Sequence, residues 1–189
     1  MTEAHELDPT LTALRDHLLQ HSVRRGDFTL KSGKRSTWFL DAKQTVCRPD
    51  GILLVAEAAL RLVPEDIDAI GGLTMGADPV AFGVAAVGAT RGRRLRAFSI
   101  RKEAKDHGVE GRLAGALLGG DRVVVTEDAA TRGTSIIEAA EVVRALGAVP
   151  VILMPIVDRG GTGAALAAAA GFEWRPLLTA PDLGFPYEG

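Results

Sequence analysis

Beyond Pro64 the chain alternates short apolar runs with segments in which Ala, Val and Ile recur at helical spacing, and this alternation limits the fold more than any other feature. The runs and helical segments follow one another at residues 67–73, 79–89, 95–100, 123–126, 135–146 and 149–157. Strands that are separated by helices pair in parallel, because the helix provides the long crossover that a parallel pair needs. The sequence therefore predicts an α/β fold with a core of parallel strands flanked by helices. A short helix and an edge strand are expected at residues 164–170 and 172–178.

The segment before Pro64 has a different pattern. Asp8 and Pro9 are typical of a helix start, and two β-prone runs are joined by a short polar connection that contains glycine. These runs, their connection and a following helix lie at residues 28–30, 37–40, 31–34 and 49–62. We expect one domain over residues 1–189, in which a small N-terminal α+β hood, mainly residues 1–62, packs on a core of residues 63–189.

Composition narrows the class of partner. The 22 Lys and Arg residues are balanced by 24 Asp and Glu residues, so no general positive field exists to attract nucleic acid. The single cysteine, Cys47, has no partner within the chain for a disulfide. No apolar stretch is long enough to span a bilayer, and the first residues lack the pattern of a signal peptide. We expect a cytoplasmic protein with neither a nucleic-acid nor a membrane partner.

The strongest chemical signal follows the apolar run at residues 123–126. Two acids, Glu127 and Asp128, come directly after it, and a short loop then leads into the next helix. That loop offers hydroxyl groups, free backbone N–H groups and a helix N-terminus, through Thr131, Gly133, Thr134 and Ser135. Such a loop at the carboxyl end of a strand forms an anion cradle of phosphate size. The acids would repel a phosphate, so they suit ribose hydroxyls or a Mg²⁺ shell; the alternative is a polar turn capped by Ser135.

Two further segments outside the hood carry groups suited to anions. Arg101, Lys102 and Lys105 form a cationic cluster that could close over a polyanion, or else a solvated surface loop. Arg159 follows the last long apolar run, where its planar fork could hold a carboxylate or simply pair with Asp158.

The hood adds a second set of open alternatives. Lys31 lies in the polar connection and either reaches the ligand or is solvated. Phe39 and Leu40 either form a flat apolar wall for a base or belong to the core of the hood.

With these residues in view, the run at 123–135 resembles the fingerprint of the type I phosphoribosyltransferases, which bind 5-phosphoribosyl 1-diphosphate (PRPP). Within that family the chain is most similar to the orotate phosphoribosyltransferases. The matching segments are residues 29–33, the loop at 101–108, and Asp158 with Arg159. The resemblance implies a type I phosphoribosyltransferase-like core with its hood.

The resemblance also implies a reaction: transfer of the phosphoribosyl group of PRPP to N1 of orotate, with release of pyrophosphate, in pyrimidine synthesis. It implies Mg²⁺ carried by the pyrophosphate rather than by protein ligands, and a homodimer in which Arg101, Lys105 and His107 serve the partner's site while Lys102 serves its own. The implied catalytic residues are Arg101, Lys105, His107 and Asp128. The implied PRPP-binding residues are Arg101, Lys102, Lys105, His107, Glu127, Asp128, Ala129, Ala130, Thr131, Arg132, Gly133, Thr134 and Ser135. The implied orotate-binding residues are Lys31, Phe39, Leu40, Thr131 and Arg159.

One departure from the family pattern concerns the loop after the first core strand. Many orotate enzymes carry a Tyr-Lys pair there whose lysine helps to bind pyrophosphate, whereas this chain has Met75 and Gly76. Backbone N–H groups and Thr74 are expected to take over that contact. Two other functions remain open: transfer to a different base, and a non-catalytic nucleotide-sensing regulator of the same fold.

Overall fold

The computed structural model describes residues 7–29, 35–105 and 111–188, with the side chains of residues 104 and 105 left out, and is built on a seven-stranded sheet. The strand order is β5-β4-β3-β6-β7-β8, and β9 also pairs with β7. Every pairing is parallel except that of β4 with β5. The strands are β3 (Ala69–Leu73), β4 (Arg96–Lys105), β5 (Gly111–Gly115), β6 (Arg122–Ala130), β7 (Val149–Asp158), β8 (Glu173–Trp174) and β9 (Leu178–Thr179). The predicted α/β class with its core of parallel strands is confirmed.

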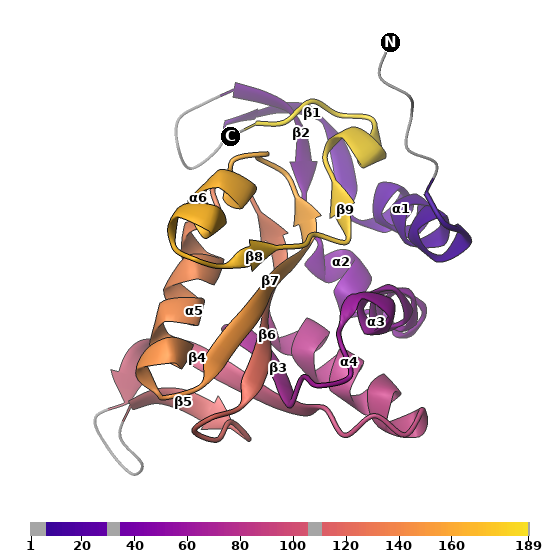
Figure 1. Ribbon diagram of the computed structural model, residues 1–189. Helices are drawn as coiled ribbons and strands as arrows, with labels where there is room; N and C mark the ends of the chain where they lie inside the picture. Colours follow the sequence, from indigo (N-terminus) through magenta and orange to yellow (C-terminus); the bar gives the residue numbers. More distant parts are fainter. Residues whose placement is uncertain (1–6, 30–34, 106–110, 189) are drawn as a thin grey trace.

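Helices cover both faces of this sheet, as Figure 1 shows. On one side lie α1 (Pro9–His21), α3 (Pro49–Leu62) and α4 (Asp78–Thr90), and on the other α5 (Thr134–Ala145) and α6 (Gly163–Ala169). Alternate residues of β6 serve the two faces: Val124 packs with the α3 and α4 side, while Val123 and Val125 pack with the α5 side. Burial on both faces explains why the strand is apolar without alternation.

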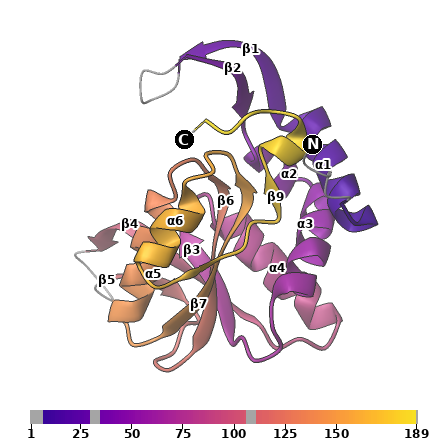
Figure 2. The ribbon, with the colours of Figure 1, turned by 45° about the horizontal axis from the view of Figure 1, so that its top comes forward.

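The hood consists of α1, the antiparallel pair β1 (Val23–Thr29) and β2 (Arg35–Leu40), and the short helix α2 (Lys43–Val46). Figure 2 shows the hairpin rising above the sheet, next to the 3₁₀ turn at Pro181–Leu183. Asp8 caps α1 through its carboxylate, which accepts from Thr10 N at 2.7 Å, and Pro9 opens the helix as predicted. Because α3 packs within the same apolar cluster as the core residues Ile70 and Val124, the boundary near residue 62 stays a prediction.

Two details differ from the sequence prediction. The segment 101–105, expected as part of a loop, continues β4. Residues 98–100 and Lys105 of this strand pair antiparallel with β5, with a shift of register between them. The expected strand at 172–178 is split into β8 and β9, which lie on either side of Pro176, a residue without an N–H for the ladder. Within the described residues, no helix is both long enough and apolar enough to cross a bilayer.

Candidate active site

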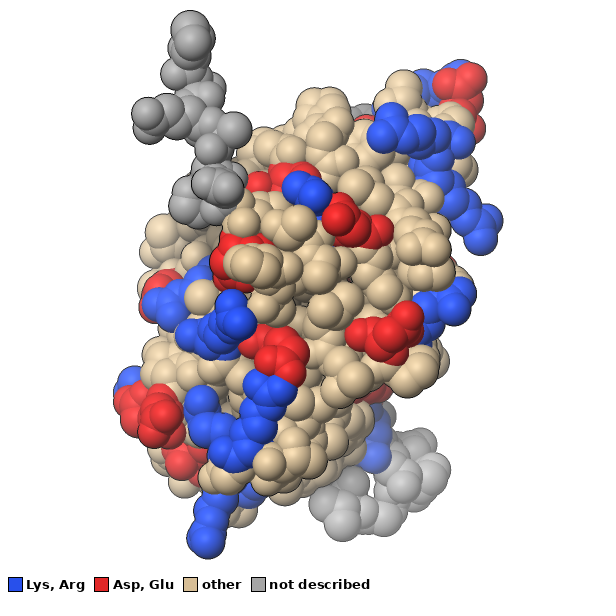
Figure 3. All heavy atoms as spheres, turned by 90° about the vertical axis from the view of Figure 1, so that its right-hand side faces the viewer, with Lys and Arg blue, Asp and Glu red and all other residues tan. Residues whose placement is uncertain are grey.

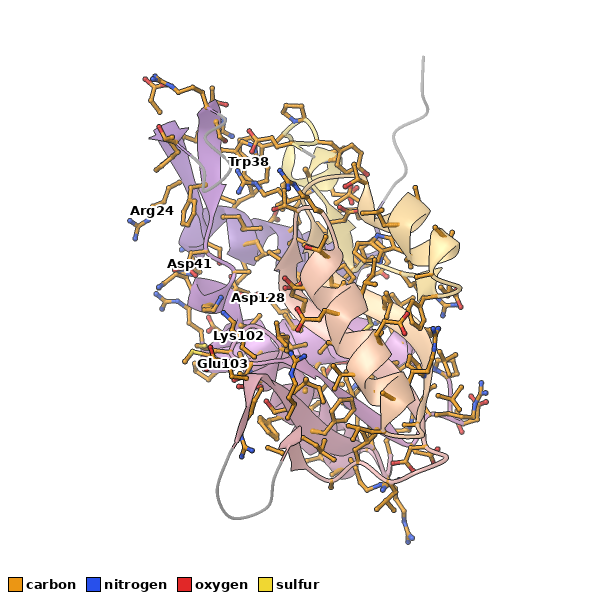
Figure 4. All side chains as sticks on the ribbon, turned by 90° about the vertical axis from the view of Figure 1, so that its left-hand side faces the viewer. Arg24, Trp38, Asp41, Lys102, Glu103 and Asp128 are labelled. Atoms are coloured by element: carbon orange, nitrogen blue, oxygen red, sulfur yellow. The ribbon has the colours of Figure 1, made fainter. Side chains whose placement is uncertain are left out.

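The carboxyl ends of β3, β4, β6 and β7 meet at one edge of the sheet, below the hood. In Figure 4, Asp128 of β6 lies between Trp38 and Asp41 of the hood above and Lys102 of β4 below, along one side of the molecule. Parallel sheets bind ligands at this edge, because the loops that leave the strands converge there. The residues that the sequence singled out are therefore brought together from the hood, β4 and β6.

The acid pair lies within β6, which runs on to Ala130 rather than ending before the acids. Asp128 is buried, and its carboxylate accepts a hydrogen bond from Lys43 Nζ at 2.5 Å and from Ala129 N at 3.1 Å. Burial first, and then the charge of Asp128, raise the pKa of Glu127 to about 8. Near neutral pH Glu127 therefore keeps its carboxyl proton.

Lys43 comes from α2 of the hood and was missed by the sequence analysis. Burial alone would lower the pKa of Lys43, but the hydrogen bond to Asp128 and the charge of that carboxylate raise it above its ordinary value. The lysine therefore stays charged and links the hood to Asp128 by this hydrogen bond. No spacing rule connects a hood lysine to a strand acid 85 positions away.

The loop after β6 has the geometry of an anion cradle. Gly133 has φ 77°, a left-handed conformation that favours glycine, and α5 begins at the next residue. A Cβ on Gly133 would also lie 3.2 Å from Gly163. No side chain caps α5, so Ser135 is not the cap that the alternative reading required, and the first N–H groups of the helix are left without a side-chain acceptor.

The loop after β3 is held next to Asp128. Asp78 accepts hydrogen bonds from Thr74 Oγ1 and from Ser99 Oγ, both at 2.6 Å. A Cβ on Gly76 would lie 2.5 Å from Asp128 Oδ1, so the close approach of this loop to the acid needs glycine. The hydroxyl of Thr74, expected to contact pyrophosphate, donates to Asp78 instead in this structure.

The predicted cationic loop is described only in part. Arg101 is half-buried on β4, and its carbonyl accepts from Arg112 Nε at 2.6 Å. Lys102 and Glu103 are exposed at the end of the same strand. The side chain of Lys105, and His107, lie outside the described residues, as does Lys31 of the hood.

Arg159 is buried at the carboxyl end of β7, with 6% of its surface exposed. Its guanidinium lies 4.6 Å from the centre of the Trp38 ring, donates to Trp38 O at 3.1 Å and forms an ion pair with Glu188. Asp158 is not its partner, since that carboxylate accepts from the N–H groups of Gly160 and Gly161 and from Trp174 Nε1. The alternative of a simple strand-end pair is therefore wrong.

Thr131 lies against the same strand end as Arg159. The backbone N–H of Arg159 donates to Ala130 O at 2.8 Å, and Gly160 is so close to Thr131 O that a Cβ would stand 1.6 Å away. Backbone contacts therefore hold Arg159 next to the anion cradle that follows β6.

The inner face of the hood hairpin is formed by alternate residues of β2. Ser36, Trp38 and Leu40 are buried, whereas Thr37 and Phe39 are exposed. Leu40 belongs to the core cluster, and Phe39 packs on Phe28 with 5.7 Å between ring centres. Phe39 and Leu40 therefore face opposite sides of the hairpin, and Trp38 is the hood aromatic that meets Arg159.

Carboxylate oxygens are donors that Mg²⁺ accepts, and Glu127 with Asp128 supply them at the edge of the cradle. Among the described residues, no group of three or more His, Cys, Asp and Glu side chains could hold a metal ion by itself.

Comparison with known proteins gives a consistent result. No model of a protein family matches the chain. An orotate phosphoribosyltransferase of Streptomyces avermitilis is 41% identical over 181 residues, which cover 94% of this chain and 99% of the relative. An orotate phosphoribosyltransferase of Nostoc sp. is 38% identical over 176 residues, covering 93% of this chain and 85% of the relative. The crystal structure of the Mycobacterium tuberculosis H37Rv orotate phosphoribosyltransferase with PRPP has a TM-score of 0.79 at 30% identity, covering 94% of this chain and all of that one (100%).

Proposed function

The chain belongs to the orotate phosphoribosyltransferase family, and from this premise we propose how its own residues carry out the reaction. It is a pentosyltransferase that joins N1 of orotate to the ribose of PRPP, giving orotidine 5′-monophosphate and pyrophosphate in pyrimidine synthesis. The observation that carries this function is the acid pair and open helix N-terminus after β6, in a chain 41% identical to such an enzyme over most of its length. Consumption of orotate in the presence of PRPP and Mg²⁺ tests it.

The 5′-phosphate of PRPP binds in the cradle of residues 129–135. The uncapped N–H groups at the start of α5 and the hydroxyls of Thr131, Thr134 and Ser135 favour an anion there. The close approach of Gly133 to α6 fixes the loop before a ligand arrives, so little ordering is needed on binding.

Glu127 and Asp128 face the ribose hydroxyls. Asp128, whose carboxyl group is held by Lys43, accepts a hydrogen bond from a ribose hydroxyl, which fixes the sugar relative to the base. Glu127 is protonated near neutral pH and becomes a full acceptor when it ionises. Orientation of the sugar matters because the displacement passes through a ribose with oxocarbenium-like charge, which the protein stabilises electrostatically rather than covalently.

Pyrophosphate leaves toward the loop after β3 and the end of β4. When bound with PRPP, Mg²⁺ would supply positive charge to neutralise the leaving pyrophosphate, and Glu127 and Asp128 are the carboxylates nearest to hold its hydration shell. Backbone N–H groups at Met75 and Gly76 and the cations Arg101, Lys102, Lys105 and His107 supply the rest. Lys43 adds a cation near Gly76, since both the lysine and that glycine adjoin the Asp128 carboxylate.

Orotate binds between Thr131 and the hood, with its carboxylate toward Arg159. The planar guanidinium suits a planar carboxylate, and in this structure it pairs with the carboxylate of Glu188 rather than with that of Asp158. Lys31, Phe39 and Leu40 stay predictions for this pocket. Of these three, Leu40 is buried in the core and Phe39 faces away from Leu40, which favours a backbone or packing role over a shared wall.

A homodimer completes the proposal: Arg101, Lys105 and His107 act in the partner's site, whereas Lys102 acts in its own. β4 and β5 form an edge hairpin at the end of the sheet, which is a suitable position for a segment that reaches another subunit. The cytoplasmic location expected from the sequence stays a prediction.

Two rival functions have distinct tests. A phosphoribosyltransferase for another base would not need a carboxylate pocket at Arg159, so assays with uracil, adenine, guanine and hypoxanthine distinguish it. A nucleotide-sensing regulator that binds nucleic acid would need a basic face. The face shown in Figure 3 carries Lys and Arg interspersed with Asp and Glu, which does not favour that role for this face.

A further inference from the structure

The segment after the 3₁₀ turn folds back over the joint between hood and core and places a carboxylate on Arg159. Glu188 Oε1 lies 2.6 Å from Ser36 Oγ, and its other oxygen, Oε2, pairs with Arg159 Nη2. The backbone of Glu188 is also attached, since its N–H donates to Arg159 O at 3.1 Å. The Glu188 carboxylate therefore contacts one residue of the hood, Ser36, and one residue of the core, Arg159.

This position coincides with the one that the proposed function assigns to the carboxylate of orotate. The backbone N–H of Arg159 donates to Ala130 O, at the start of the loop that is proposed to bind PRPP. The Trp38 ring of the hood covers the guanidinium of Arg159. A buried guanidinium without an anion is costly, so the arginine needs a carboxylate whether or not substrate is bound. In the structure the chain itself supplies one.

Glu188 does not satisfy every hydrogen-bond donor of the Arg159 guanidinium. Arg159 Nε is buried and has no hydrogen-bond partner within the described residues. Glu188 divides its two oxygens between Ser36 and Arg159 Nη2, so it cannot use the side-on geometry in which one carboxylate accepts from both Nε and Nη. A ligand carboxylate that takes both N–H groups would satisfy the unused donor.

Release of Glu188 requires movement of only a few residues. Phe185 is buried, stacks on Trp38 with 4.3 Å between ring centres, and donates from its N–H to Ala180 O, so it anchors the segment. Pro186 and Tyr187 beyond it are exposed, although the Tyr187 ring covers Gly161. Glu188 can leave while Phe185 and the hood stay in place.

We propose that Ser36 and Arg159 together form a binding site for a carboxylate. Glu188 occupies this site in the unliganded chain, and the carboxylate of orotate displaces Glu188 from it. Glu188 thereby sets the affinity for orotate. The proposal rests on the proposed function for the identity of the ligand. When a competing group occupies a site for most of the time, the apparent affinity for the ligand falls by the fraction of molecules whose site is free.

The test compares Glu188→Gln with Glu173→Gln, a control at an exposed glutamate that also pairs with an arginine, Arg175. If Glu188 is docked in about nine of ten unliganded molecules, Glu188→Gln lowers the orotate Kd and KM by about tenfold and leaves the KM for PRPP unchanged. Glu173→Gln should change neither. The Tm of unliganded Glu188→Gln should fall, and orotate should raise it by more than it raises the wild-type Tm.

A second variant separates competition from a merely structural contact. Ser36→Ala removes the contact from the hood and should weaken orotate binding in the Glu188→Gln background. In the wild-type background the loss should be smaller, because the same change also removes a hydrogen bond that holds Glu188. The inference fails if Glu188→Gln leaves orotate affinity unchanged, weakens it, or weakens orotate and PRPP together. Wild-type protein that turns over no orotate would overturn the proposed function instead, and a larger thermal shift of Glu188→Gln with orotate than with uracil would still support the carboxylate site.

Discussion

Lys43 of the hood and Asp128 of the sheet are joined by a hydrogen bond of 2.5 Å between Nζ and Oδ2, across the edge where the substrates are proposed to bind. Asp128 is 7% exposed, so the lysine provides a charged hydrogen-bond donor to a buried carboxyl group beside a second acid. The contact between Lys43 and Asp128 therefore links the position of the hood to the acid that is proposed to bind the ribose.

Replacement of Lys43 tests this connection. In Lys43→Ala the carboxylate of Asp128 loses its cation and its fixed orientation, and we expect kcat/KM for PRPP to fall by about ten- to a hundredfold. Lys43→Arg should restore part of the loss, because it keeps the charge. Arg61→Ala, which removes an exposed ion pair with Asp8, is the control and should have little effect on steady-state kinetics. Unchanged PRPP kinetics in Lys43→Ala would contradict the role of the lysine.

Glu127 gives the unliganded protein a pH dependence with a definite sign. Its pKa of about 8 in the folded chain lies above the value of about 4.3 for an unfolded glutamate, so the folded state holds the proton more tightly. The free energy of unfolding should therefore decrease, through this residue, as the pH rises from about 4.3 to about 8. Unfolding curves of wild type and Glu127→Gln measured across this range should converge at low pH and differ increasingly toward pH 8.

The same group should release a proton when PRPP binds with Mg²⁺. Ribose hydroxyls and the metal favour the ionised carboxylate, so binding near pH 7 should lower the pKa of Glu127. Titration calorimetry in two buffers with different ionisation enthalpies measures the protons released. Glu127→Gln should release fewer; equal release from both proteins would assign the proton to another group.

Arg159→Lys tests the carboxylate pocket. Lysine keeps the positive charge but loses the planar fork and the stacking on Trp38. The KM for orotate should rise by about tenfold or more, while the KM for PRPP changes little. An equal loss for both substrates would remove Arg159 from the base pocket.

Lys105 is the residue whose charge we expect to matter most at the leaving pyrophosphate. Lys105→Ala should fold normally and lose about a hundredfold in kcat, the usual effect of removing one preorganised donor. Arg94→Ala, at an exposed arginine near the opposite end of β4, is the control. Turnover near that of the wild type would contradict the role.

Complementation tests the shared site. Lys105→Ala and Asp128→Asn should each be nearly inactive. If the loop acts across a dimer, refolding the two together should restore about a quarter of wild-type activity, because half of the dimers are mixed and each mixed dimer has one intact site. Activity that stays at the level of the separate variants would place Lys105 in its own subunit's site.

The phosphate cradle could be predicted because its parts are contiguous. The apolar strand, Glu127 with Asp128, and Gly133 follow one another, and the carboxyl end of a parallel strand fixes where they lie. Alternating strand and helix patterns likewise predicted the sheet. β5 was missed because its own five residues, Gly111–Gly115, begin and end with glycine and have no apolar alternation.

The contacts between hood and core could not be predicted in the same way. Ser36 and Glu188 are separated by 152 positions, and Lys43 and Asp128 by 85, so only the folded packing brings them together. Arg159 was found from its position after a strand, but its partner was not, because Asp158 is used by backbone N–H groups and the carboxylate arrives from a distant segment.

The most direct test of the central claim follows the absorbance of orotate with PRPP and Mg²⁺, with and without a chelator. The account predicts metal-dependent consumption of orotate with stoichiometric release of pyrophosphate, and no consumption of uracil, adenine, guanine or hypoxanthine. No consumption of orotate by folded protein that still binds PRPP in a calorimeter would contradict it.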